Sequence, residues 1–190
     1  MKRTIILTAA IVAAIASLAQ VPSDSVGVFA ITEGKTVRLE PLNFAGTKTN
    51  VLGTALTYGI ASTKIKHTYN GATSPVALSS PAKLRLRFGS VPPAKTMRYY
   101  MFSPQYTPRD FSVARFDVKK GKRILTGGKV NIWSGASMGV EQDEAVSISY
   151  DEAAENDYVL TVAAPPGEYC LFFSVNGTGV YNTVFDFTIK

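Results

Sequence analysis

The chain has 190 residues with 20 Lys or Arg against 14 Asp or Glu, and it contains one cysteine and one histidine. One cysteine excludes an intramolecular disulfide, and one histidine without a thiol pair argues against a metal centre. The length is sufficient for a single domain that buries its own hydrophobic core.

Residues 1–19 have the pattern of a secretory signal peptide. Lys2 and Arg3 precede an apolar run that ends at Leu18, and small residues occupy the −3 and −1 positions of the expected cleavage site. The run is short for a bilayer span, and no cysteine follows it for acyl anchoring. We therefore expect an exported protein, periplasmic or at the cell surface, with a single domain over residues 20–190 and no remaining membrane span.

Charge is distributed unevenly along the expected mature chain. Residues 20–140 hold 17 Lys or Arg and 5 Asp or Glu, whereas residues 141–190 hold 1 and 9. Two interpretations remain open. Acidic later strands can lie beside basic earlier strands and neutralise them within the fold. Otherwise the molecule has two oppositely charged ends, which suit head-to-tail contacts or an acidic partner.

Most of the chain consists of short segments with the period-two alternation of β-strands, separated by Gly, Pro and Asn turns. No segment has a sustained helical period, so the pattern predicts an all-β fold of about ten short strands. Hairpins are expected over 26–40, 64–78 and 111–126. The Asn70-Gly71 pair predicts a tight turn in the second hairpin, and Gly127-Gly128 predicts a break in the chain after the third.

The segment 83–88 alternates between charged and apolar residues without a break. Its charged face holds Lys83, Arg85 and Arg87 at spacings of about 7 Å, twice the rise per residue of a strand. Such a row suits phosphate, sulfate or an acidic protein surface, and it is the candidate interaction face. The alternative is an edge or open face of a sheet that charge keeps soluble.

Two aromatic residues are candidate ligand contacts. Tyr106 lies in the loop 103–110, and Trp133 ends the segment 129–133, in which Val130 and Ile132 share one side. Exported β-sandwiches often stack sugars on such amphipathic rings, although Tyr106 is equally suited to covering a sheet edge. The sole histidine, His67, is expected to be a solvated strand residue.

Residues 135–139 match the G-x-S-x-G nucleophile elbow of serine hydrolases, with Ser137 at its centre. The elbow requires a helix after the serine and a histidine later in the chain that activates its hydroxyl. An acidic turn and a strand are expected here instead, and no histidine follows His67. We therefore predict a Gly-Ser loop between two strands, no catalytic residue, no cofactor and no metal ion.

The segment 151–157 contains four carboxylates and is expected to be a solvated acidic loop or a single helical turn. It lacks the Asp-x-Asp-x-Asp-Gly spacing of a calcium-binding loop.

The last 26 residues predict a buried hairpin that closes the domain. Within it, Cys170 is expected to be a small buried hydrophobe. The sequence Gly167-Glu168-Tyr169 resembles the tyrosine corner of immunoglobulin-like domains, in which the phenol binds an upstream backbone group and holds a connection between sheets. We therefore expect an antiparallel β-sandwich, with an immunoglobulin-like architecture as one possibility. The expected inward face of the hairpin comprises Tyr169, Leu171, Phe173, Val175, Tyr181, Thr183, Phe185, Phe187 and Ile189.

Short motifs at both ends of the expected mature chain carry a resemblance to a known group of proteins. They are Gly27-Val28-Phe29-Ala30, Glu33-Gly34-Lys35, Val37-Arg38-Leu39-Glu40-Pro41, Pro166-Gly167-Glu168-Tyr169 and Phe185-Asp186-Phe187. With these motifs the chain resembles exported all-β proteins of Bacteroides-type bacteria whose function is unknown. Its last segment also resembles the C-terminal sorting β-sandwiches of a Bacteroidetes secretion route. Neither resemblance supplies a catalytic residue.

Three functions follow, in order of preference. The first is a non-catalytic binding or assembly module of the cell envelope with a protein or glycan partner. The second is carbohydrate binding, and the third is a serine hydrolase that uses Ser137. Nucleic-acid binding is not expected, because the chain has an export signal and lacks the stacking aromatics of known modules.

Overall fold

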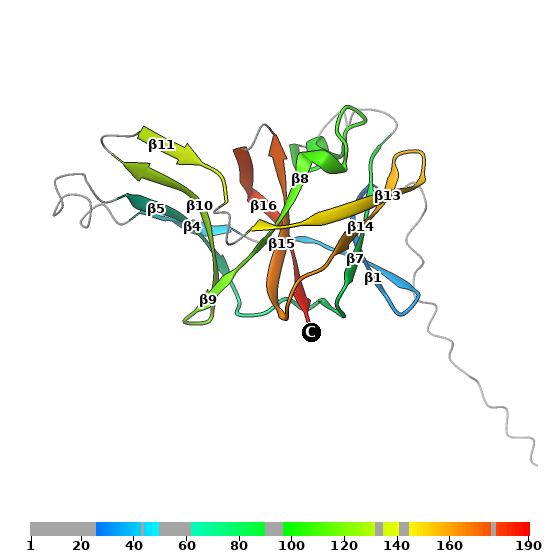
Figure 1. Cartoon of the computed structure of the whole chain (residues 1–190), viewed down its shortest axis with the longest axis horizontal. Coiled ribbons are helices and arrows are strands. Elements are labelled where there is room, and N and C mark those ends of the chain that lie inside the picture. The colour runs from blue at the N-terminus through cyan, green and yellow to red at the C-terminus, as the bar shows by residue number, and fades with distance from the viewer. Residues whose placement is uncertain are drawn as a thin grey trace, which may run out of the picture.

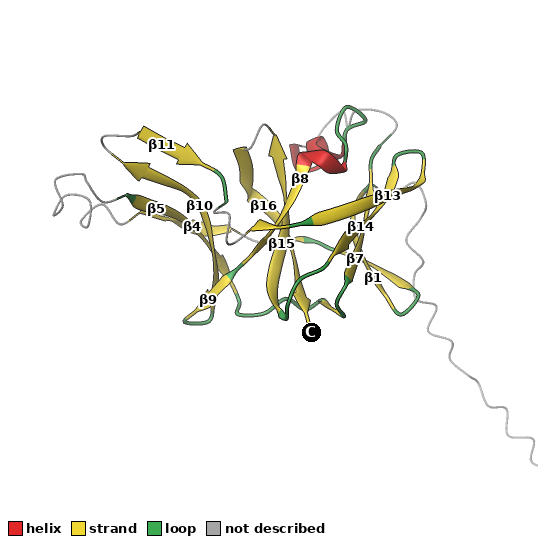
Figure 2. Cartoon of the chain, in the orientation of Figure 1, coloured by secondary structure: helices red, strands yellow, loops and turns green. Residues whose placement is uncertain are grey.

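The computed structural model describes residues 26–42, 44–49, 62–89, 97–131, 135–140, 145–175 and 178–190. The expected signal peptide and Trp133 lie outside these residues. Within them, sixteen strands form three sheets, and two short 3-10 helices lie beside the sheets (Figures 1 and 2). The all-β prediction is confirmed. There are more strands than the ten expected, because several pair over only two or three residues.

Sheet 1 has the strand order β13-β14-β7-β1-β2. Its first hairpin, β1–β2, is confirmed, and Glu33 and Gly34 both have positive φ, as a primed hairpin turn requires. The acidic segment 151–157 was wrongly expected to be a loop or helical turn. Strand pairing continues to Ala154 opposite Asp157, and the turn between them has Asn156 at φ 59. The strands are β1 (Gly27–Thr32), β2 (Lys35–Arg38), β7 (Ala82–Arg87), β13 (Ile148–Ala154) and β14 (Asp157–Val162).

Sheet 2 is the central sheet, with the order β12-β8-β15-β16-β3 and β6 pairing with β16. One hydrophobic cluster joins it to sheet 1, and a second, smaller cluster joins it to sheet 3. Strand β15 is therefore buried without interruption from Glu168 to Phe173, which is typical of a strand with both faces covered. Its strands are β3 (Pro41–Leu42), β6 (Ala77–Leu78), β8 (Phe111–Arg115), β12 (Ala145–Val146), β15 (Gly167–Val175) and β16 (Thr178–Ile189).

The closing hairpin is confirmed as β15–β16, but its predicted single inward face is wrong at Tyr181. The register shifts between Phe172 and Phe173, whose partners are Val184 and Val180. Three residues of β16 therefore lie between Val180 and Val184 without a partner in the ladder. Successive strand residues point to opposite sides, so this odd number reverses the side on which the side chains before Val184 point. Tyr181 consequently packs in the cluster toward sheet 3, whereas Phe185 packs toward sheet 1.

Sheet 3 has the order β11-β10-β5-β4, with β9 pairing with β10. The hairpin predicted at Asn70-Gly71 is wrong, because the chain leaves sheet 3 there and enters sheet 2 at β6. The predicted break at Gly127-Gly128 is also wrong, since β10 continues through it with a bulge after Thr126. The strands are β4 (Phe44–Thr49), β5 (Thr63–Asn70), β9 (Asp117–Lys119), β10 (Lys122–Asn131) and β11 (Gly135–Met138).

The tyrosine corner is present at the passage from sheet 1 to sheet 2. The Tyr169 hydroxyl donates to the carbonyl of Pro165 at 2.6 Å, and the ring is fully buried. Cys170, the next residue, is buried, as expected, and forms no disulfide in the described residues. The connection between β14 and β15 is therefore held by a hydrogen bond that the sequence predicts.

Two short 3-10 helices lie at either end of the expected loop 103–110, and the second occupies its last residues. They are η1 (Met97–Phe102) and η2 (Pro108–Asp110). Met101 and Phe102 bury their side chains against the core between sheets 1 and 2. Thr107 caps η2, since its hydroxyl accepts from the backbone N–H of Arg109 at 3.3 Å.

Candidate functional site

The predicted basic row on β7 lies in the middle of sheet 1, between β14 and β1. The Arg85 guanidinium donates two hydrogen bonds of 2.7 Å to Asp157, and Nε of Arg87 donates to the same carboxylate at 3.1 Å. The Arg87 guanidinium also lies 5.4 Å from the ring centroid of Phe29. Lys83 is exposed. Two of the three predicted cations therefore share an internal carboxylate, and one projects into solvent.

A buried charge cluster connects sheets 2 and 3. Nη1 of Arg123 contacts Asp186 directly and lies 3.8 Å from Glu168, and all three side chains are nearly inaccessible to solvent. The remaining guanidinium nitrogens donate to the carbonyls of Asn70 and Gly71 at 3.1 and 3.2 Å. This cluster fixes the point where the chain crosses between sheets. It also explains why Asn70-Gly71 does not close a local hairpin.

These ion pairs bear on the uneven charge distribution. Asp157, Glu168 and Asp186 belong to the acidic last part of the chain, and each contacts an arginine from the basic first part. The acidic and basic segments therefore neutralise each other in part within the fold. The charges that remain exposed determine the electrostatic character of the surface.

Tyr106 does not present a free ring. Its ring lies edge-on to Phe173, with centroids 4.7 Å apart, and edge-on to Tyr100 at 5.4 Å. It packs against the core between sheets 1 and 2. The exposed aromatic of this region is Tyr100, with 52% of its surface accessible and its hydroxyl accepting from Nε2 of Gln105 at 3.1 Å.

His67 is buried, which corrects the expectation of a solvated residue. Its ring lies 4.7 Å from that of Tyr181 and 5.9 Å from that of Phe44, and Nδ1 is 3.5 Å from the Thr47 hydroxyl. Within the described residues, neither its Nε2 nor the Tyr181 hydroxyl has a hydrogen-bond partner. Burial lowers the pKa of His67 and raises that of Tyr181 to about 12. Both groups are therefore held in their neutral forms.

We expect the protein to lose stability as the pH falls below about 6.5, the ordinary pKa of an unfolded histidine. The pKa of His67 is lower in the folded state, so the unfolded chain binds the proton more readily and acid favours unfolding. Urea unfolding at pH 7.5 and pH 5.5 measures this loss, with the neutral variant His67→Gln as the control. Equal pH dependence in both proteins would show that His67 does not contribute.

Ser137 lies in strand β11 and does not form a nucleophile elbow. It is opposite Lys129 of β10, which is opposite Lys64 of β5 on its other side. The strand β10 thus separates Ser137 from His67, and no helix follows the serine in the described residues. The geometry that activates a hydrolase serine is not formed here.

Lysines from four strands gather on the side of sheet 3 that faces away from sheet 2. On β5, Lys64 and Lys66 alternate with Ile65 and the inward-facing His67. Asp117, which bonds to Lys119 at 2.6 Å, is the only carboxylate in the described strands of this sheet. We name this surface the lysine face, and it comprises Lys48, Lys64, Lys66, Lys119, Lys122 and Lys129.

The register places these lysines directly opposite one another in three cross-strand pairs. The pairs are Lys48 with Lys66, Lys64 with Lys129, and Lys119 with Lys122. Opposed residues on one side of a sheet have Cβ atoms about 5 Å apart, and like charges at that distance are destabilising. The sheet therefore concentrates positive charge on one side, and Asp117 offsets part of it at the Lys119–Lys122 pair.

Sequence reasoning missed the lysine face because its members come from segments up to 81 residues apart, from Lys48 to Lys129. The local signal was the i, i+2 spacing of Lys64 and Lys66. The basic row at 83–88 gave a stronger local signal, but its arginines face an internal carboxylate.

In the residues that the structure describes, no helix has the length and apolar character needed to cross a membrane. The same residues contain no group of three or more His, Cys, Asp or Glu side chains placed to hold a metal ion. Comparison with family models, curated proteins and solved structures gives no significant match.

Proposed function

We propose that the protein is an exported, non-catalytic binding module of the cell envelope, and that the lysine face is its binding surface for an acidic partner. Export is inferred from the signal-peptide pattern of residues 1–19. The observation that carries the binding surface is the set of three opposed lysine pairs. An anionic partner that binds this surface is attracted by several lysines at once, and this charge complementarity favours it over neutral or basic partners.

Retention on a sulfated polysaccharide column tests this surface, because heparin is a defined polyanion. Salt weakens exposed ionic contacts, because charges are screened beyond about 10 Å at 0.1 M salt. A surface with fewer lysines needs less salt to release heparin, so we expect Lys48→Gln/Lys122→Gln to elute at clearly lower salt than the wild-type protein. The matched control is Lys35→Gln/Lys83→Gln, which removes two exposed lysines from sheet 1. Equal shifts for both variants would mean that only net charge matters, and would overturn the proposal.

Stability provides a second readout that separates binding from folding. Removal of lysines from opposed pairs reduces like-charge repulsion, so Lys48→Gln/Lys122→Gln should unfold at a urea concentration no lower than the wild-type protein does. Weaker retention together with unchanged or higher stability is therefore the expected combination. A variant that elutes early because it is partly unfolded would be recognised by its lower unfolding midpoint.

Carbohydrate binding is a second candidate, and it is supported by Tyr100. This ring is exposed, lies edge-on to that of Tyr106 and accepts a hydrogen bond from Gln105 at its hydroxyl. An exposed aromatic ring is the kind of surface on which a sugar stacks. Binding of neutral oligosaccharides that survives removal of the lysines would favour this candidate over the lysine face.

A further inference from the structure

We infer that the acidic partner of the lysine face is the β13–β14 hairpin of a second copy of this chain, so that copies associate head to tail. This inference rests on the proposed function, and it names the partner of the proposed binding surface. It starts from the carboxylates that the fold leaves exposed. Asp151, Glu152 and Glu155 are exposed at this hairpin, and in the described residues none of them forms an ion pair.

The hairpin differs from the rest of the acidic last part of the chain. Asp157, at its base, bonds to Arg85 and Arg87, and Glu168 and Asp186 are buried beside Arg123. The three hairpin carboxylates are left for an external partner. Asp151 and Glu152 are consecutive in β13 and point to opposite sides of the sheet, and Glu155 follows the end of that strand, so the carboxylates surround the tip of the hairpin. Ala153 and Ala154, which lie between them, are exposed and small.

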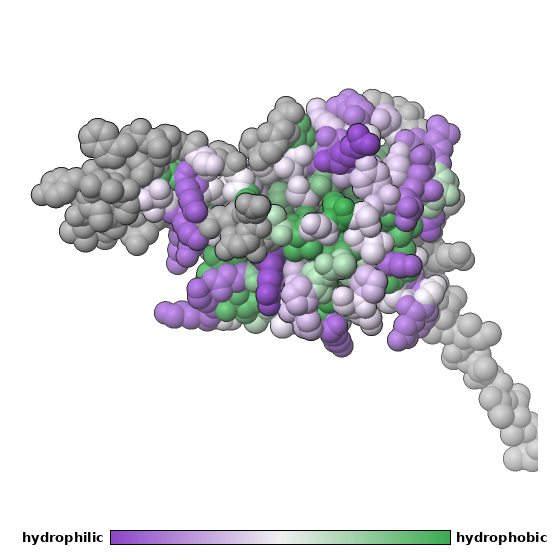
Figure 3. All heavy atoms as spheres, in the orientation of Figure 1, coloured by the Kyte–Doolittle hydropathy of each residue, from purple (hydrophilic) through white to green (hydrophobic). Residues whose placement is uncertain are grey.

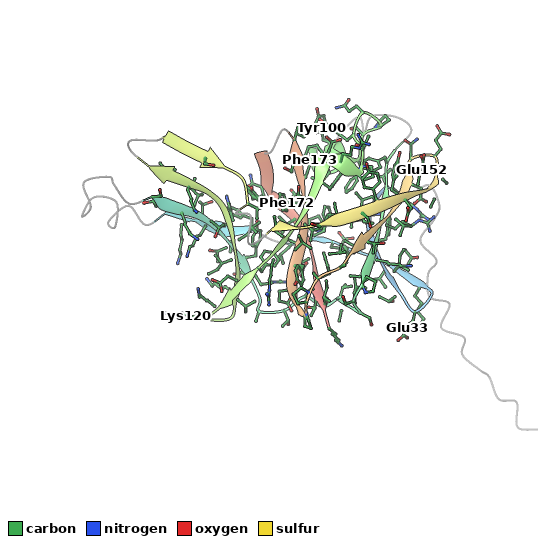
Figure 4. The ribbon with its side chains drawn as sticks, in the orientation of Figure 1. Glu33, Tyr100, Lys120, Glu152, Phe172 and Phe173 are labelled. Atoms are coloured by element: carbon green, nitrogen blue, oxygen red, sulfur yellow. The ribbon has the colours of Figure 1, made fainter. Side chains whose placement is uncertain are left out.

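The hairpin and the lysine face belong to opposite ends of the described structure. The hairpin belongs to sheet 1 and the lysine face to sheet 3, and sheet 2 packs between those two sheets. In Figure 4, Glu152 and Lys120, which lies at the turn between two lysine-bearing strands, are at opposite ends of the molecule. In Figure 3, hydrophilic residues cover the region of the β13–β14 hairpin, and hydrophobic residues are visible near the middle of the view. One copy cannot bring the two surfaces together, whereas two copies can.

A contact between two different surfaces of identical chains is heterologous, and it propagates unless its rotation closes a ring. Each exposed ion pair contributes little, commonly under about 1 kcal/mol, and salt screens it. The expected assembly is therefore concentration-dependent and dissociates in salt. It leaves a free lysine face at one end and a free acidic hairpin at the other.

Sedimentation velocity of the whole protein and two charge-reversal variants tests this arrangement. The face variant is Lys48→Glu/Lys122→Glu and the hairpin variant is Asp151→Lys/Glu155→Lys. We expect the wild-type protein to form species larger than a monomer at low salt and to become monomeric at high salt. Each variant alone should be monomeric at both salt concentrations. The hairpin variant carries positive charge at both ends, and the face variant opposes its four remaining lysines with two new glutamates and Asp117, so its face no longer attracts the acidic hairpin.

An equimolar mixture of the two variants should associate again at low salt, because each supplies the surface that the other lacks. Non-specific aggregation would not show this restoration. A wild-type monomer at low salt, association of either variant alone, or a monomeric mixture would each overturn the inference.

Heparin retention distinguishes failure of this inference from failure of the proposed function. The face variant should lose retention, and the hairpin variant should keep or increase it, because its lysine face is intact. A monomeric wild-type protein whose retention depends on the lysine face would leave the proposed binding surface in place and exclude a second copy as its partner. Retention that is independent of the lysine face, in a monomeric protein, would overturn both.

Discussion

Replacement of Arg123 by methionine is expected to lower the free energy of unfolding by about 3 to 5 kcal/mol. Methionine preserves much of the side chain's length and its packing on Phe116, over whose ring the guanidinium lies at 5.6 Å. It leaves Asp186 and Glu168 buried without their cation, and it removes the donors to two backbone carbonyls. Urea unfolding monitored by circular dichroism measures the loss.

The matched control is Arg85→Met on β7. Arg85 is 28% exposed, and its partner Asp157 retains Arg87 as a second cation. The loss there should not exceed about 1 kcal/mol, the upper range for exposed pairs. If both substitutions cost the same, burial of the cluster would not be the cause. Addition of Asp186→Asn and Glu168→Gln to Arg123→Met should restore part of the lost stability, because buried amides carry no net charge.

The features that sequence predicted correctly are those whose determinants lie close together in the chain. The closing hairpin follows from period-two alternation on both sides of a short turn. The Tyr169 hydroxyl reaches a carbonyl only four residues upstream, and burial of Cys170 follows from its apolar neighbours. In these cases a window of about ten residues contains the interaction that decides the structure.

Long-range pairing decided the features that sequence did not predict. Arg123 lies in the hairpin expected over 111–126, where no local pattern indicates burial. It is buried because it contacts Asp186 and Glu168, which are 63 and 45 positions later in the chain. Asn70-Gly71 has the residues of a hairpin turn, yet the two carbonyls bind Arg123 and the chain continues to another sheet. The lysine face likewise depends on registers among four strands, which no local pattern specifies.

Gly127 illustrates the same limit in a single residue, and its replacement by alanine is expected to cost about 1 to 3 kcal/mol or more. Sequence suggested a break in the chain, whereas the structure places the glycine at a bulge within β10. A Cβ at this position would lie 2.5 Å from Nε2 of His67 and 2.8 Å from Cε2 of Tyr181. Both rings are buried and belong to other strands, so neither can move without opening the contact between sheets 2 and 3.

Gly167→Ala is the control for the general effect on stability of replacing a strand glycine with alanine. A Cβ at Gly167 would lie 3.0 Å from Nε of Arg115, an exposed side chain that can rotate away, so we expect a change of less than about 1 kcal/mol. Gly127 also has no left-handed φ, and space alone therefore requires the glycine. The double variant Gly127→Ala/His67→Ala removes the ring that the new methyl group strikes. Its loss should be smaller than the sum of the two single losses, and strict additivity in urea unfolding would contradict the steric explanation.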